Sequence, residues 1–164
     1  MNANLVAFMD VIAHTEGSDQ APDQYRVCFA RRHTILDLNY HPAEPRPPDG
    51  LIEWKGEPLD FLGAQYEGEV STAAGRYQMR LKTWLGCKKV LSLSGFTATA
   101  QDDSCVLLIK QRGALALVNA GLIQEAIICC KDEWASFPGG HSHQPEHDFA
   151  YMLDFYGHAG GALA

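Results

Sequence analysis

The first stretch of the chain alternates apolar and polar residues with the spacing of a helix. From Asn4 onward, apolar residues recur at positions i, i+3, i+4, i+7 and i+8, which predicts an amphipathic helix with one buried face. Asn2 or Asn4 can cap its start, because a short polar side chain accepts hydrogen bonds from the unpaired N–H groups of the first turn. Gly17 is the expected stop, so Glu16 falls in the last turn. The apolar positions are Leu5, Phe8, Met9, Ile12 and Ala13.

Residues 18–70 do not continue this periodicity. They contain several prolines and glycines, and their apolar runs are short, such as residues 26–29 and 34–38. This pattern is typical of short strands and loops. The proline-rich stretch 42–50 indicates a stiff surface connection. We interpret it as a loop within one domain, because neither flanking segment is large enough to fold alone.

Helical spacing returns in the second half of the chain. A helix over 96–112 is predicted, with Thr97 or Thr99 as its cap and Gly113 as its stop. Residues 105–109 are apolar on every side, so we expect this helix to be buried. Three further apolar stripes predict helices: Tyr77, Leu81, Trp84 and Leu85, with Gly86 as a break; Ile123, Ile127, Cys130 and Trp134; and Phe149, Met152, Leu153 and Tyr156.

The predicted fold class is α+β, mainly α. We expect a single domain over 1–164, in which a helical body (about 1–17 and 71–164) carries a small strand-and-loop lobe (about 18–70). With 164 residues, of which 46% are apolar, the chain can bury a core without disulfides or metal. A lobe inserted after the first helix predicts a cleft between lobe and body.

Charge and cysteine content narrow the class of protein. The formal net charge is −7 and the 13 Lys and Arg residues are scattered, so there is no basic stripe to bind nucleic acid. The early apolar run is interrupted by Asp10 and lacks the flanks of a signal peptide. No apolar run approaches the roughly 20 residues that span a bilayer. The five cysteines form an odd set without CxxC pairs, which indicates free thiols. We therefore expect a monomer made in the cytoplasm, without a signal peptide, a cofactor or membrane insertion.

Glu16 is the leading candidate for chemistry. At the end of the first helix its carboxyl would face the predicted cleft, where the negative end of the helix dipole and partial burial both raise the pKa of an acid. A glutamic acid that stays protonated near neutral pH can protonate a glycosidic oxygen so that it leaves as an alcohol. On position alone, however, a glutamate near a helix end is more often a solvated surface residue.

Several co-ordered segments add a more specific indication. They read AFMD (7–10), TEGSD (15–19), AGRYQ (74–78), KQRGA (110–114) and WASFPG (134–139). In this order and at similar spacing they resemble the lambda-type phage endolysins. The resemblance extends from about residue 7 to Gly161 and is weakest in the middle lobe.

The resemblance implies a lysozyme-like fold and lytic transglycosylase activity on the bond between N-acetylmuramic acid and N-acetylglucosamine in peptidoglycan. In that mechanism one glutamate protonates the leaving oxygen and then takes the proton of the muramic acid 6-hydroxyl, which closes a 1,6-anhydro ring. Glu16 matches that glutamate by its Glu-Gly-Ser-Asp context. No second carboxylate is required as a nucleophile, unlike in two-carboxylate glycosidases.

The resemblance also implies substrate-binding residues. Gly75 to Gln78 resembles the Gly-x-x-Gln element that lines the glycan cleft of lytic transglycosylases, and the Gln78 amide can donate and accept hydrogen bonds. Tyr77 offers a face for a pyranose ring; the alternative is that Tyr77 belongs to the core and Gln78 is solvated. Ser71, just upstream, is a weaker cleft candidate.

Trp134 and Ser136 occupy the place where related transglycosylases carry an Ala-Tyr-Asn element close to the acid. Trp134 also completes the stripe that starts at Ile123, so packing is as good an interpretation as sugar contact. Ser136 could reach the cleft. Asp19 and Asp37 are the other carboxylates expected near it, but a cap and a loop contact explain them equally well. Neither is assigned a catalytic role.

The histidine-rich stretch near the C-terminus superficially resembles a metal site. His141, His143 and His147 lie near Glu146, but a Gly-Gly turn and Pro145 interrupt the spacing. No helical zinc motif fits it. We expect a mobile polar loop and no metal.

Two other functions also fit the sequence. A hydrolytic lysozyme would add water across the same bond, and a cell-wall-binding or virion structural module would keep the fold without catalysis. The intact Glu16 and Gly75 to Gln78 motifs argue against the second. For the enzyme we expect peptidoglycan glycan strands as the substrate, action on the cell wall during host lysis, and dependence on a separate membrane-permeabilising protein.

Overall fold

Helix α1 (Ala3–Thr15) follows from the apolar spacing near the N-terminus. Its cap is Asn2, whose side chain accepts a hydrogen bond from the Asn4 backbone N–H at 2.9 Å, and the apolar stripe of the helix is buried. Gly17 follows with a φ of +70°, a left-handed conformation that ends a helix. The predicted helix is confirmed, and Glu16 is its C-cap residue, just beyond the last helical residue.

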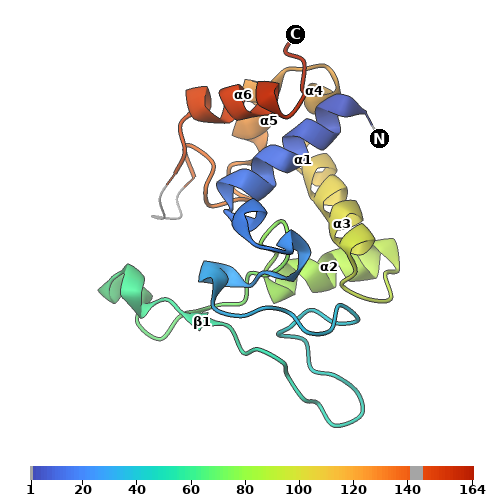
Figure 1. Cartoon of the computed structure of the whole chain (residues 1–164), viewed down its shortest axis with the longest axis vertical. Coiled ribbons are helices and arrows are strands. Elements are labelled where there is room, and N and C mark those ends of the chain that lie inside the picture. The colour runs from blue at the N-terminus through green and yellow to red at the C-terminus, as the bar shows by residue number, and fades with distance from the viewer. Residues whose placement is uncertain (1, 141–145) are drawn as a thin grey trace. The chain divides into compact units, whose positions relative to one another are not determined.

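The computed structural model describes residues 2–140 and 146–164. The chain divides into two units. Unit 1 consists of Met1–Gly17 and Cys105–Ala164, and unit 2 consists of Ser18–Ser104. The boundary falls inside helix α3 (Ala98–Gln111), so unit 2 also contains residues 71–104, which the sequence pattern assigned to the helical body (Figure 1). The single domain over 1–164 stays a prediction.

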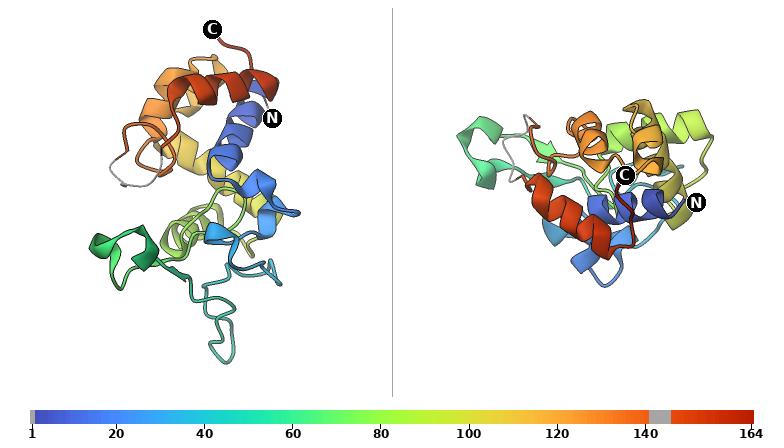
Figure 2. Two further views of the ribbon diagram at one scale, coloured as in Figure 1. Left: turned by 60° about the vertical axis from the view of Figure 1, so that its left-hand side comes forward. Right: turned by 90° about the horizontal axis from the view of Figure 1, so that it is seen from above.

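Unit 1 is a helical bundle. Besides α1 it contains α4 (Leu115–Asn119), α5 (Ile123–Cys130) and α6 (Phe149–His158). Helix α1 packs against α4 and α6, and α5 packs against the same two helices (Figures 1 and 2). Trp134 is buried as predicted, but it lies beyond the end of α5. No helix among the described residues has the length and apolar character needed to cross a bilayer.

Aromatic contacts fix the end of α1 that carries Glu16. The His14 ring stacks on Phe155 of α6 with ring centroids 3.8 Å apart, and His14 Nε2 is hydrogen-bonded to the Tyr151 hydroxyl at 2.6 Å. On another side of the helix, Phe8 packs edge-on against Phe137 at 6.2 Å. Helix α1 is therefore held from two directions within unit 1, near its middle at Phe8 and in its last turn at His14.

Unit 2 contains short elements and loops, which confirms the prediction for residues 18–70. Strands β1 (Glu57–Pro58) and β2 (Val70–Ser71) pair antiparallel, with Glu57 opposite Ser71. Five 3-10 turns precede or separate them: Ser18–Gln20, Gln24–Arg26, Phe29–Arg31, Asp60–Leu62 and Ala64–Tyr66.

Helix α2 (Leu81–Leu91) differs from the prediction at both ends. Tyr77 lies in the turn before it, because Gln78 adopts a φ of +48° that a helix cannot contain. Gly86 was expected to break the helix but lies in its middle. One helical glycine costs only about 1 kcal/mol, and the burial of Trp84 and Cys87 on either side outweighs that cost.

The predicted start of the helix over 96–112 is confirmed in its cap. The Thr97 hydroxyl accepts a hydrogen bond from the Ala100 backbone N–H at 3.2 Å. At the other end, Gly113 has a φ of +75°, which suits the residue that follows a helix. Cys105, Leu108 and Ile109 of α3 are buried, as their apolar surroundings in the sequence predict.

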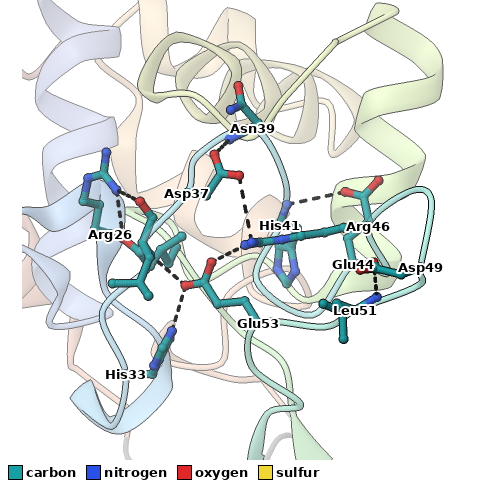
Figure 3. Close-up of polar contacts among 12 residues, drawn as sticks. Arg26, His33, Asp37, Asn39, His41, Glu44, Arg46, Asp49, Leu51 and Glu53 are labelled. Atoms are coloured by element: carbon teal, nitrogen blue, oxygen red, sulfur yellow. Dashed lines mark hydrogen bonds and ion pairs between the residues drawn. The ribbon is translucent and has the colours of Figure 1, made fainter.

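An ion-pair network holds the proline-rich connection against the rest of unit 2 (Figure 3). The Glu53 carboxylate, only 5% exposed, accepts a hydrogen bond from the Leu36 backbone N–H and contacts His33 and Arg46. Burial raises the pKa of Glu53, but these hydrogen bonds outweigh it, so its pKa is lowered. Asp37 lies 3.9 Å from Arg46, which supports the loop-stabilising interpretation of Asp37. The connection is therefore an integral part of unit 2.

The turn that links the bridged residues Val27 and Thr34 is strained. Its central residues, Ala30 and Arg31, have φ values of 54° and 56°. Two successive positive φ angles define a type I′ turn, which favours Asn-Gly. Neither residue is of that kind, so their side chains clash locally with the backbone.

We expect Ala30→Gly to raise the free energy of unfolding by about 1 kcal/mol, because glycine adopts a positive φ without the steric cost of a Cβ. Urea denaturation measures the change. Ala150→Gly on the exposed face of α6 is the matched control and should lower stability, since it removes a helix-favouring residue. Equal destabilisation by both glycines would show that the turn carries no strain.

Candidate functional site

The carboxyl of Glu16 is paired with a side chain 120 residues further along the chain. The Ser136 hydroxyl donates a hydrogen bond to Glu16 Oε1 at 2.7 Å. Both residues belong to unit 1. Ser136 is only 8% exposed, whereas Glu16 is partly exposed, so the Ser136 side of the bond is shielded from water while the Glu16 side chain stays accessible.

The environment of Glu16 raises its pKa from 4.5 to about 7. Burial is the largest cause, because removing a carboxylate from water disfavours its charged form. The hydroxyl and the backbone N–H of Ser136 oppose this by donating to the carboxylate, and they lower the pKa. The direction agrees with the prediction from the sequence. Near neutral pH, Glu16 is therefore poised between acid and base.

Buried aromatic residues hold the segment that carries Ser136. Phe137 is fully buried and contacts Trp134, with ring centroids 5.6 Å apart. The Ser136 carbonyl accepts a hydrogen bond from the His147 backbone N–H at 2.9 Å. Trp134 is only 3% exposed, so its ring has no open face for a sugar and the packing interpretation is favoured.

In unit 2, the Gly75 to Gln78 motif forms a tight turn that orients the Gln78 amide. Gln78 Nε2 donates to the carbonyls of Gly75 at 2.9 Å and Val27 at 3.3 Å. Among the residues that the structure describes, Oε1 of Gln78 has no hydrogen-bond partner. The Oε1 atom of Gln78 is therefore left as an acceptor, while both N–H groups of Nε2 are directed at backbone carbonyls.

Sequence reasoning missed Gln101, which clamps this turn. Its fully buried side chain accepts a hydrogen bond from the Arg76 backbone N–H at 2.9 Å and donates to the carbonyls of Tyr25 and Phe96 at 3.0 and 2.9 Å. A Cβ on Gly75 would lie 2.2 Å from Gln101 Oε1, so only glycine fits at that position. The sequence does give one indication of this role, because Gln101 is an uncharged amide beside the apolar face of the helix predicted over 96–112.

Tyr77 and Ser71 have internal partners instead of open faces. Tyr77 is fully buried, and its hydroxyl donates to Asp102 at 2.6 Å. The alternative that Tyr77 belongs to the core is therefore favoured over stacking on a sugar. Ser71 is also buried, and its hydroxyl accepts a hydrogen bond from the Ala73 backbone N–H at 3.3 Å.

The histidine-rich stretch is only partly within the described residues. His141 and His143 lie outside them. Glu146 accepts a hydrogen bond from the Gly139 backbone N–H at 2.9 Å, and His147 stacks on Tyr151 with centroids 4.7 Å apart. Over residues 2–140 and 146–164, no group of three or more metal-ligating side chains gathers at one point.

The structure thus brings Glu16, Ser136 and Trp134 together in unit 1, while Ser71, Tyr77 and Gln78 belong to unit 2. That all six line one glycan cleft stays a prediction. Asp19 is exposed, and Asp37 belongs to the ion-pair network of unit 2.

Solved structures with the same fold are lysozymes of a bacteriophage. The structure of bacteriophage lambda lysozyme complexed with a chitohexasaccharide matches with a TM-score of 0.81 and 29% identity, over 100% of this chain and 98% of the other. A second lambda lysozyme structure matches with a TM-score of 0.79 and 28% identity, with the same coverage. The chain therefore has a lysozyme-like fold, in which a mainly helical architecture includes a small sheet.

Sequence relatives name the family. The endolysin of Escherichia phage P2 is 32% identical over 98% of this chain and 95% of its own length, and the endolysin of Escherichia phage lambda is 30% identical over 99% and 95%. The endolysin family model matches residues 6–163. The chain belongs to the endolysin family and is an enzyme that degrades peptidoglycan in host-cell lysis.

The raised pKa of Glu16 predicts a stability cost at high pH. The folded state holds a proton with a pKa of about 7, against 4.5 for the free side chain. Stability is therefore lost as the pH rises from 4.5 through 7. Glu16→Gln, which has no titrating group, should exceed the native chain in stability by about 2 to 3 kcal/mol at pH 8 and match it near pH 4.5.

Urea denaturation at both pH values measures this difference. Glu125→Gln on the exposed face of α5 is the control for loss of one carboxylate and should show no such gain at pH 8. Equal stability of native and Glu16→Gln protein at pH 8 would mean that the Glu16 carboxyl is solvated.

Proposed function

We propose that this endolysin is a lytic transglycosylase. It cleaves the β-1,4 bond between N-acetylmuramic acid and N-acetylglucosamine and forms 1,6-anhydro-N-acetylmuramic acid. Glu16 is the catalytic acid and base. The observation that carries the proposal is the Glu16 carboxyl, with a pKa of about 7 and one oxygen held by Ser136.

A pKa near neutrality suits a group that must act first as an acid and then as a base. Protonated Glu16 gives its proton to the glycosidic oxygen, the C1–O bond breaks, and the N-acetylglucosamine end leaves as an alcohol. The Glu16 carboxylate then takes the proton of the muramic acid 6-hydroxyl while O6 bonds to C1. Glu16 ends protonated again, and no water is consumed.

The surroundings of Glu16 support one carboxylate more than two. A retaining glycosidase needs a second carboxyl group about 5 Å away as its nucleophile. In the described part of the chain, the groups that shift the pKa of Glu16 are those of Ser136, and none of them is a carboxylate. An intramolecular hydroxyl as the nucleophile removes the need for one.

Gln78 is the proposed substrate-binding residue of unit 2. Because its Nε2 donates to two backbone carbonyls, its Oε1 can accept from an acetamide N–H or a sugar hydroxyl. The similar lambda lysozyme has been solved in complex with a chitohexasaccharide, and we propose that peptidoglycan glycan strands bind this chain too. Tyr77 and Ser71 then act by shaping the turn and strand around Gln78, and Trp134 by holding the segment of Ser136.

We further propose that the protein is a monomer without a cofactor, made in the host cytoplasm. Its substrate lies in the cell wall, so a separate membrane-permeabilising protein must give it access. A net charge of −7 leaves recognition of the anionic wall to contacts with sugars.

The second candidate is a hydrolytic lysozyme, which is favoured by the similarity to structures of bacteriophage lambda lysozyme. The two mechanisms differ in the product. Mass spectrometry of digested sacculi should give muropeptides that are one water lighter than hydrolysis products, because O6 replaces water as the nucleophile. Products of full hydrolytic mass would establish the lysozyme mechanism instead.

Substitutions of Glu16 test its role directly. Glu16→Gln keeps the shape but has no transferable proton, so lysis of permeabilised Gram-negative cells should fall by at least about a thousandfold while sacculus binding persists. Glu16→Asp should lose about a hundredfold, because the shorter side chain withdraws the acid by about 1 Å. Turbidity loss measures activity, and circular dichroism confirms that each variant is folded.

The other two carboxylates serve as controls. Asp19→Asn and Asp37→Asn should retain measurable lysis, because the mechanism requires no second carboxylate. A folded Asp37→Asn protein without activity would favour a two-carboxylate hydrolase. Near-normal lysis by folded Glu16→Gln would refute the proposal, and pelleting with sacculi without any turbidity loss by the native chain would indicate a binding module.

A further inference from the structure

Ser136 was grouped with residues that could contact the substrate, but its contacts point to another role. Its hydroxyl has a single hydrogen to donate, and that hydrogen bonds to Glu16 Oε1 at 2.7 Å. With 8% of its surface exposed, Ser136 has little area left for a sugar. Both its hydroxyl and its backbone N–H donate to the carboxyl of Glu16.

We infer that Ser136 is a positioning residue of the transglycosylase reaction, which holds Oε1 of Glu16 so that Oε2 carries the transferable proton. This inference rests on the proposed role of Glu16. A protonated carboxyl has one carbonyl-like oxygen and one hydroxyl oxygen. With the Ser136 hydroxyl donating to Oε1, Oε1 takes the carbonyl-like role, and Oε2 is the oxygen left to carry the proton.

The same bond serves both halves of the reaction. When Glu16 has given up its proton, the Ser136 hydroxyl donates to a charged oxygen, and such a bond is stronger than one between neutral groups. It stabilises the carboxylate against the burial that disfavours it. Without Ser136, Glu16 would bind its proton more tightly and its carboxyl could rotate, so proton donation to the glycosidic oxygen would be slower.

The surrounding segment is built to hold Ser136 in register with Glu16. Phe137, its neighbour in sequence, packs edge-on against Phe8 of α1, the helix that ends at Glu16. The backbone N–H of His147 donates to the Ser136 carbonyl at 2.9 Å. The hydroxyl and the carboxyl are therefore fixed to the same packed core.

Several other titratable groups of unit 1 have partners other than Glu16. On α1 and α6, His14 is hydrogen-bonded to Tyr151, and His158 lies 3.5 Å from Asp154. Around α5, Arg112 pairs with Glu133 at 2.7 Å. Helix α4 carries no ionisable side chain. Ser136 is the group whose removal should move the titration of Glu16.

Ser136→Ala on the full chain tests the inference. The pKa of Glu16, followed by carbon NMR of its labelled carboxyl in the free protein, should rise by about one unit, because a hydrogen bond to the charged form is lost. In the pH profile of the rate on sacculi, the pH at which activity declines should rise by the same amount. We expect kcat to fall about tenfold and KM to stay within about twofold.

Ser136→Thr keeps the hydroxyl and should restore the NMR titration and the pH profile. Ser104→Ala is the matched control, since the Ser104 hydroxyl is also buried and donates at 2.7 Å, but to the carbonyl of Ala100. It should leave the pH profile in place even if it lowers the melting temperature. A shift in Ser104→Ala equal to that in Ser136→Ala would reduce Ser136 to a structural residue and overturn the inference.

Two further outcomes separate this inference from the proposed function. A raised KM in Ser136→Ala with an unchanged Glu16 titration would make Ser136 a substrate contact and overturn the inference alone. Active Glu16→Gln would overturn the proposed function, whereas the NMR titration would still report whether Ser136 sets the protonation of Glu16.

Discussion

The burial of one carboxyl at the end of α1 is the constraint on which the candidate site depends. Taking a carboxylate out of water is unfavourable unless it is paired or hydrogen-bonded. Glu16 has no cation among the groups that shift its pKa in the described part of the chain, only the hydroxyl and backbone of Ser136. Burial of the Glu16 carboxylate is therefore unfavourable for folding, and the packing of unit 1 has to offset this cost.

That packing holds α1 from two directions, near its middle and in its last turn. Phe137 contacts Phe8 on the side of Ser136, and Phe155 stacks on His14 from α6. An exposed helix end would fray and let water reach the carboxyl. Because the aromatic contacts hold the helix, Glu16 and Ser136 keep a fixed geometry. Burial raises the pKa of Glu16 and the Ser136 hydrogen bonds lower it, with a net value of about 7.

Local patterns in the sequence were enough to predict α1, a cap at Asn2 or Asn4 and the position of Glu16, because these depend on spacing within one helix. They were not enough for α2, since the positive φ of Gln78 and the burial of Trp84 override local helical spacing. The bond between Ser136 and Glu16 joins residues 120 positions apart, and no local pattern encodes such a pairing. The stacking role expected for Tyr77 conflicts with its complete burial for the same reason, because burial depends on tertiary contacts.

The two leading candidate residues share a physical device, although they belong to different units. Ser136 occupies Oε1 of Glu16 and leaves Oε2 for a proton, while the backbone carbonyls of Gly75 and Val27 occupy Nε2 of Gln78 and leave Oε1 as an acceptor. In each case a hydrogen bond within the protein engages one end of a side chain that can both donate and accept hydrogen bonds. A group with two possible hydrogen-bonding modes then offers a ligand only one. A glycan carries groups that match each mode, namely a bridging oxygen that can be protonated and hydroxyl or acetamide hydrogens that can be donated, and this chemistry supports the proposed glycan substrate.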